Sequence, residues 1–189
     1  MSHPAGRHPI PHKPGITSTA GRKGGKKLLA FIAVAIAAGI PFAFGKYFEL
    51  NFPDPYDSAA NVYSAKHILD GAKLGVDEIP SCAMGTLVVN IIGVKIFGFN
   101  EAGPKLIQGI MQGAAFILMF AAMRRLFGTL AAAVGVIIAS IYLSAPLIAK
   151  FGNVKEQYMI ACMVMGMSCF VLSQLNGRWW QVLLAGGFF

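Results

Sequence analysis

The chain has 189 residues, of which 56% are hydrophobic and only 13% are charged, and its formal net charge is +8. This composition excludes an ordinary soluble domain, in which about a quarter of the residues are charged. The basic residues lie at the ends of long apolar runs rather than in a stripe interleaved with aromatic residues, which excludes a nucleic-acid partner. The sequence therefore predicts an all-α, polytopic helical integral membrane protein.

The three cysteines give no sign of a metal site or a disulfide framework. Cys82, Cys162 and Cys169 form no CxxC pair, and their number is odd. We interpret them as small apolar side chains that fill space in the helical bundle.

Residues 1–27 are rich in Pro, Gly, His, Ser and Thr, and they carry six Lys or Arg residues and no acid. Such a segment has too few apolar residues to fold, so we expect a disordered basic tail in the cytoplasm. The transmembrane helical domain is expected to cover residues 28–189. Its first apolar run predicts a span at about 28–45, and no small-x-small cleavage site follows it, which favours an uncleaved anchor over a signal peptide.

Residues 46–81 form the one long polar segment, and they contain six of the eight acidic residues. Asp54 precedes a proline, which favours extended backbone, so we expect Asp57 to cap the helix that follows. This helix has one apolar face, made by Ala59, Val62, Ala65 and Leu69. We expect that face to lie on the bilayer surface, with Asp54 and Asp57 at the boundary between membrane and water.

Further apolar stretches follow this loop. The first, residues 82–99, is interrupted by polar residues and glycines, whereas residues 104–123, 127–149 and 158–175 read as clean spans. The last stretch, 179–189, starts with two tryptophans typical of a membrane interface and covers about half a span. Its abrupt end leads us to expect that the chain is part of a longer protein.

The topology depends on whether residues 82–99 cross the membrane. If they do not, the segments 1–27, 124–125 and 176–178 share one side and carry nine basic residues and no acid. The positive-inside rule favours this arrangement, with those segments in the cytoplasm. All eight acidic residues then face the outer compartment, including the candidate site residues Asp54, Asp57, Glu78 and Glu156.

Several short motifs resemble the N-terminal half of the GT-C glycosyltransferases. They are "KHILDGAKLG", "DEIPS", "KIFGFNEAGPKLIQGIMQ", "MRRLFG" and "GNVKEQ", and the overall likeness covers roughly residues 28–189. The pattern is most similar to the protein O-mannosyltransferase and aminoarabinose-transferase group. The resemblance implies an outer first loop with juxtamembrane helices, one of them at 82–99, and an acid in that loop that acts at the transferred sugar. It also implies a polyprenyl-phosphate sugar donor.

The resemblance assigns candidate catalytic residues one by one. Asp57 matches the first-loop acid, with Asp54 as the second candidate. Glu78 matches the acid before the proline, although Ile79 stands where the aminoarabinose-transferase group commonly has lysine. Glu156 matches the acid of the second outer loop. The alternatives are a helix N-cap and nothing more for Asp57, a turn residue for Asp54, and solvated surface charges for Glu78 and Glu156.

Glycosyl transfer requires an acceptor that loses a proton and a phosphate that departs. A carboxylate can act as the base or as a ligand of a divalent metal ion, while Lys or Arg can neutralise phosphate. We expect Lys150 and Lys155, beside Glu156, to contact the phosphate. A solvated charge is the alternative for Lys155.

Two functions remain in competition at this point. The first is an enzyme that acts at the outer face of a bacterial inner membrane on a sugar linked to polyprenyl phosphate, if the chain is a fragment of a full transferase. The second is a non-catalytic accessory subunit that packs against other membrane proteins. A transporter or channel is disfavoured, because the predicted spans contain no ionisable residue away from their ends.

Overall fold

The computed structural model describes residues 20–54, 56–145 and 152–188, with side chains from Leu28 onward. All regular secondary structure in these ranges is α-helical, and no β-strand occurs within them. Three of their helices are long and apolar enough to cross a membrane, at Leu28–Asn51, Ala102–Ser144 and Lys155–Asn176. The predicted fold class, a polytopic helical membrane protein, is confirmed.

The chain divides into two compact units, residues 1–33 and residues 34–189. Among the described residues, the first unit contains only the start of helix α1 (Ala20–Asn51), which continues into the second unit. The helix begins eight residues before the predicted span and inside the segment that we expected to be disordered. Lys and Arg are good helix formers, and a helix nucleated by an apolar span extends readily into them.

Helices α2 (Asp57–Leu69) and α3 (Met84–Phe97) pack against each other in the second unit. Val62 and Ala65 of α2 are buried against Val94 and Ile91 of α3. The expectation that this face of α2 lies on the bilayer is therefore wrong, because the neighbouring helix covers it. The 14 residues of α3 extend over about 21 Å, which is shorter than the hydrocarbon core of a bilayer.

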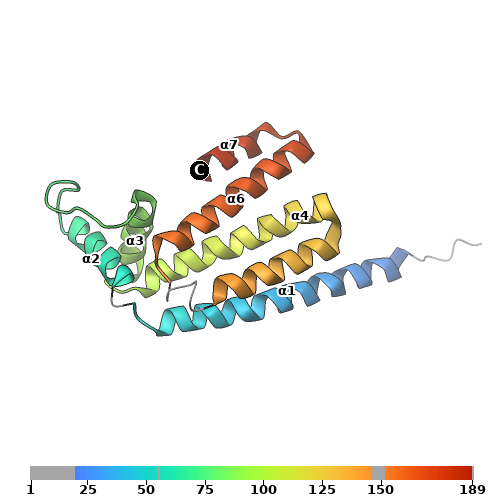
Figure 1. Ribbon diagram of the computed structural model, residues 1–189, viewed down its shortest axis with the longest axis horizontal. Helices are drawn as coiled ribbons and strands as arrows, with labels where there is room; N and C mark the ends of the chain where they lie inside the picture. The colour runs from blue at the N-terminus through green and yellow to red at the C-terminus, as the bar shows by residue number, and fades with distance from the viewer. Residues whose placement is uncertain (1–19, 55, 146–151, 189) are drawn as a thin grey trace, which may run out of the picture. The chain divides into compact units, whose positions relative to one another are not determined.

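Helix α4 (Ala102–Ser144) turns back on itself at Gly128, where φ is +85° and ψ is 173°. Figure 1 shows its first half in yellow and its second half in orange, running in opposite directions. A side chain at Gly135 would meet Met123, which places the two halves against each other. The halves include the predicted span 104–123 and most of the span 127–149, of which residues 146–149 lie outside the described residues. Only glycine adopts this backbone conformation readily, so Gly128 sets the position of the reversal.

Helix α6 (Lys155–Asn176) lies between α4 and α7 (Trp179–Phe188). Ala115 of α4 packs with Ala161 and Met165 of α6, and Phe188 of α7 packs against this cluster. The stretch predicted as a partial span is thus a ten-residue helix that folds back along α6 (Figure 1).

Contacts between helix ends group the polar segments of the second unit. Lys105 at the start of α4 donates a hydrogen bond to the carbonyl of Phe52 after α1 (3.0 Å), and the hydroxyl oxygen of Tyr158 on α6 lies 3.2 Å from the Pro104 carbonyl oxygen. Arg125 and Asn176 are hydrogen-bonded at the other end of the helices. Residues 52–101 and the residues just before α6 therefore lie at the same end of the bundle, away from the arginine pair.

Candidate functional site

A buried network of amides and hydroxyls joins α2, α3 and the start of α6. Asn153, just before α6, exchanges two hydrogen bonds with the amide of Asn90 on α3, at 2.9 and 3.0 Å. Its Nδ2 also donates to Ser58 Oγ on α2 (2.9 Å), and its Oδ1 accepts from the Tyr158 hydroxyl (2.8 Å). The Asn61 side chain donates to the Asn153 carbonyl (3.1 Å). All five residues are buried, so these bonds are shielded from water.

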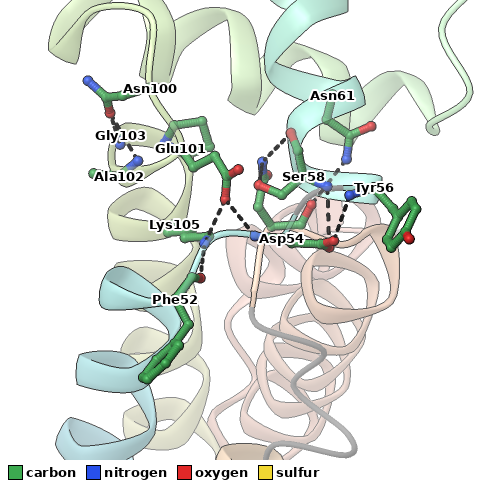
Figure 2. A network of polar contacts seen from close by, with 12 residues as sticks. Phe52, Asp54, Tyr56, Ser58, Asn61, Asn100, Glu101, Ala102, Gly103 and Lys105 are labelled. Carbon is green, nitrogen blue, oxygen red and sulfur yellow. Dashed lines mark hydrogen bonds and ion pairs between the residues drawn. The ribbon is translucent and has the colours of Figure 1, made fainter.

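The start of α2 is held by Asp54 and not, as we expected, by Asp57. The carboxylate of the buried Asp54 accepts hydrogen bonds from the N–H groups of Tyr56 (3.0 Å) and Ser58 (3.4 Å), as Figure 2 shows. Asp side chains commonly bond the backbone two residues further on, which explains this choice. Asp57 is instead the first residue of the helix, and its side chain is exposed. Its carboxylate is consequently available at the surface.

A buried ion pair fixes the chain before Asp54. Lys105 on α4 is only 2% exposed, and its ammonium group lies 2.7 Å from the carboxylate of Glu101. The same carboxylate accepts a hydrogen bond from the N–H of Asp54 at 3.3 Å, and Lys105 also bonds the carbonyl of Phe52 (Figure 2). The ion pair therefore connects the end of α1, the start of α4 and the approach to α2.

The end of α1 also contacts the residue before Asn153. Lys46 pairs with the buried carboxylate of Glu49 at 2.5 Å and donates to Gln108 on α4 at 3.4 Å. A Cβ atom at Gly152 would lie 2.8 Å from Glu49 Oε2. Glu49 thus packs directly against the backbone at Gly152, which leaves no room for a side chain there.

A polar cavity of about 140 Å³ lies at the starts of α2 and α6. It is lined by Asp57, Asn61, Ser81, Cys82, Lys155 and Glu156. Helices α2, α3 and α6 all begin at or next to the cavity, and none of them has a hydrogen bond from its own N-cap side chain. The Asp54 carboxylate already caps the start of α2, so the positive dipole ends of α3 and α6 are the ones added to the charge of the lysine, and they oppose the two carboxylates.

A larger apolar groove of about 720 Å³ lies beside the polar cavity, and the two share Lys155 and Glu156. Its walls come from α3, α4, α6 and α7, and its apolar lining includes Val89, Met111, Met159, Cys162, Met163 and Phe188. Because the charged residues stand where the two spaces meet, the arrangement suits an amphiphile with a polar head and an apolar chain.

Glu78 takes part in a separate contact on α2. Its carboxylate accepts hydrogen bonds from Ser64 Oγ (2.6 Å) and from His67 Nδ1 (2.8 Å). Hydrogen bonds from His67 and Ser64 hold the pKa of the Glu78 carboxyl below its usual value. This contact ties the loop between α2 and α3 to α2, and Ser81 and Cys82 at the end of that loop line the polar cavity.

The structure thus brings Asp57, Lys155 and Glu156 together among the predicted site residues. Asp54 and Glu78 do not line the cavity, and Lys150 lies outside the described residues. Sequence reasoning missed other contributors, which are Asn61, Ser81, Cys82, Asn90 and Asn153. A polar residue inside an apolar run and a Gly-Asn pair before a helix were the available signals for the two buried asparagines.

The comparison with known protein families agrees with the resemblance that the sequence motifs indicated. The family model for dolichyl-phosphate-mannose-protein mannosyltransferases matches residues 84–189, which is more than half of the chain. The chain belongs to this family. The predicted resemblance to GT-C glycosyltransferases is confirmed. The part matched to the mannosyltransferase family contains Lys155 and Glu156, whereas Asp57 precedes it. No curated protein and no solved structure matches the chain.

Proposed function

We propose that the chain forms the donor site of a membrane glycosyltransferase that moves a sugar from a polyprenyl-phosphate carrier to an acceptor hydroxyl. The observation that carries this proposal is the junction of the polar cavity and the apolar groove at Lys155 and Glu156. The sugar and phosphate fit the polar side of this junction, and the isoprenoid chain fits the apolar side. Membership of the mannosyltransferase family supports the reaction class.

The charges around the cavity suit a phosphate. Lys155 is exposed in the cavity wall, and α3 and α6 begin at or next to the cavity with backbone N–H groups at their N-terminal ends. Phosphate groups bind favourably at such helix starts because backbone N–H groups and the helix dipole both attract anions. As the sugar leaves, these groups stabilise the negative charge that stays on the phosphate.

The two carboxylates of the cavity have complementary roles in this mechanism. The bond between the sugar C1 and the phosphate oxygen breaks, and its electron pair leaves with the lipid phosphate. The acceptor oxygen forms the new bond to C1, and Asp57 accepts the proton that this oxygen loses. Glu156, next to Lys155, stabilises the positive charge that develops on the sugar ring. Asp54 and Glu78 hold α2 and its loop in place.

The polar cavity offers two carboxylates, those of Asp57 and Glu156, as ligands for a divalent metal ion. Within the described ranges, no group of three or more His, Cys, Asp or Glu residues is placed to hold one. Asp57 and Glu156 would be the residues that hold a cation shared with the donor phosphate, as Mg²⁺ is often held by one or two carboxylates and substrate phosphates. Such an ion would neutralise the departing phosphate.

The basic segments support one orientation. Residues 1–27 and Arg124, Arg125 and Arg178 carry no neighbouring acid, so the positive-inside rule favours the cytoplasm for them. Because the cavity lies at the end of the helices away from the arginine pair, we propose that it opens to the outer face of a bacterial inner membrane, with the N-terminus in the cytoplasm.

The native cysteines allow a direct test of donor binding. Cys82 lines the polar cavity, Cys162 lines the apolar groove, and the buried Cys169 lines neither. In lipid nanodiscs, a long-chain polyprenyl phosphate should slow alkylation of both Cys82 and Cys162 and leave Cys169 unchanged. The matching polyprenol, which has no phosphate, should protect Cys162 only. Equal alkylation of Cys82 with and without the polyprenyl phosphate would contradict the proposal.

A further inference from the structure

We infer that Asn153 is a positioning residue, whose side-chain amide holds the start of α6 against α2 and α3 and so sets the separation of Glu156 from Asp57. The catalytic consequence of this inference rests on the proposed function, whereas its geometric content does not. Asn153 touches no cavity surface itself, since it is fully buried and absent from the cavity lining.

The amide of Asn153 has no hydrogen-bonding capacity left over. Its two N–H groups serve Asn90 Oδ1 and Ser58 Oγ, and the two lone pairs of its Oδ1 serve Asn90 Nδ2 and the Tyr158 hydroxyl. If the Asn153 amide were rotated by 180°, its NH2 group would face the NH2 group of Asn90 and its oxygen would face the oxygen of Asn90. The network therefore specifies a single orientation of the side chain, and no shorter or differently shaped residue can replace all four bonds.

The bonds to Ser58, Asn61 and Asn90 connect Asn153 to α2 and α3, which begin at or next to the polar cavity. Ser58 directly follows Asp57, and Asn61, which bonds the Asn153 carbonyl, lines the cavity. Asn90 belongs to α3, whose start adjoins Cys82. Along the chain, Asn153 lies two and three residues before Lys155 and Glu156. One buried residue thus links the three segments that carry the cavity's functional groups.

The backbone at this point is also restricted. Gly152 and Asn153 are both left-handed, with φ of +79° and +54°, and Glu49 packs against Gly152. Asparagine is one of the few residues that tolerate this conformation, so its backbone preference and its amide act together. Glycine shares the backbone tolerance but lacks the amide. Asn153→Gly therefore isolates the contribution of the side-chain hydrogen bonds.

A cross-linking experiment tests, without an activity assay, whether Asn153 holds the start of α6 next to the segment before α3. In the full chain carrying Cys162→Ser and Cys169→Ser, native Cys82 and a cysteine introduced by Lys155→Cys line the same small cavity. A short bis-methanethiosulfonate linker should join them. Adding Asn153→Gly should remove most of the cross-link, because the start of α6 is no longer tied to α2 and α3.

The matched control is Ser140→Ala, which removes a buried hydrogen bond from Ser140 Oγ to the Ala38 carbonyl (2.5 Å) between α4 and α1. It should leave the cross-link intact. Ser58→Ala removes only one bond of the network and should give a partial loss, which keeps the test decisive if Asn153→Gly does not fold. Full cross-linking in both network variants, or an equal loss with Ser140→Ala, would overturn the inference.

The consequence for transfer is measured separately, in a chain that keeps all its cysteines and Lys155. Asn153→Gly should lower kcat by about 10²-fold with little change in KM for the polyprenyl-phosphate sugar, as expected when reacting groups are displaced by about 1 Å. A lost cross-link with wild-type kcat would show that Asn153 does not position the reacting groups. A protein that cross-links as predicted but transfers no sugar would contradict the proposed function and leave the geometric inference supported.

Discussion

The ion pair between Lys105 and Glu101 gives a prediction whose size follows from burial. The Lys105 side chain is 2% exposed and that of Glu101 20% exposed, and Lys105 also bonds the Phe52 carbonyl. Breaking a buried ion pair by removing one partner costs about 3–5 kcal/mol. Because Glu101 retains some contact with water and its bond from the Asp54 N–H, we expect Lys105→Met to cost about 3 kcal/mol, the lower end of that range.

The exposed pair Lys66–Asp70 provides the matched control, since it has the same i,i+4 spacing and side chains that are 41% and 56% exposed. Exposed helical pairs contribute about 0.3–0.5 kcal/mol, so Lys66→Met should have little effect. For a chain of this size, 1 kcal/mol corresponds to about 2–4 °C in Tm. Lys105→Met should therefore lower Tm by about 6–12 °C and Lys66→Met by about 1–2 °C.

The measurement is thermal unfolding of the purified proteins in detergent. Unfolding is monitored through the fluorescence that develops when newly exposed cysteines react with a fluorogenic maleimide. Equal Tm values for Lys105→Met and Lys66→Met would refute the reasoning, because burial would then not determine the contribution of the ion pair. If adding Glu101→Gln to Lys105→Met restores the Tm, the unpaired carboxylate of Glu101, rather than lost packing, causes the decrease in stability.

Three other predictions concern single groups. The hydrogen bonds from His67 and Ser64 lower the pKa of Glu78, so its stabilising contribution is present above the unfolded-state pKa and is lost as pH falls through the folded pKa. Ser64→Ala should weaken this dependence in acid unfolding below about pH 5, and an unchanged slope would contradict it. Burial raises the pKa of the Cys82 thiol. Its alkylation rate should therefore keep rising with pH where the rate of an exposed thiol has levelled off. A pH–rate profile equal to that of an exposed thiol would contradict this prediction. Gly128→Ala should cost about 1–3 kcal/mol in denaturant unfolding from backbone strain alone, since no atom lies within 4 Å of the added Cβ, whereas a neutral result would contradict the backbone angles.

Charge and hydropathy predicted that acidic residues far apart in the sequence lie on the same side of the membrane, although they did not predict which of these residues line the cavity. Asp57 and Glu156 are 99 positions apart, yet counting spans and basic segments predicted that they share one side of the membrane, and both line one cavity. That argument works because basic residues and apolar run lengths report the global path of the chain. It needed no knowledge of side-chain packing.

Details that depend on neighbouring helices could not be predicted in the same way. The pattern of α2 showed an apolar face at Val62 and Ala65, but a pattern does not say whether lipid or another helix covers it, and α3 does. The choice between Asp54 and Asp57 as the cap is a matter of local geometry that both residues satisfy in sequence. Asn90 and Asn153 looked like interruptions, because only the folded chain shows that their amides pair.

The most direct test of the account is sugar transfer from a polyprenyl-phosphate sugar by the purified native protein and its Asp57→Asn and Glu156→Gln variants. Asp70→Asn, which makes the same chemical change at an exposed residue of the same loop segment, is the control. The account predicts that both cavity variants fold with normal Tm and lose transfer, while Asp70→Asn retains it. Full transfer by Asp57→Asn or Glu156→Gln would contradict the assignment of the cavity as the site of the reaction.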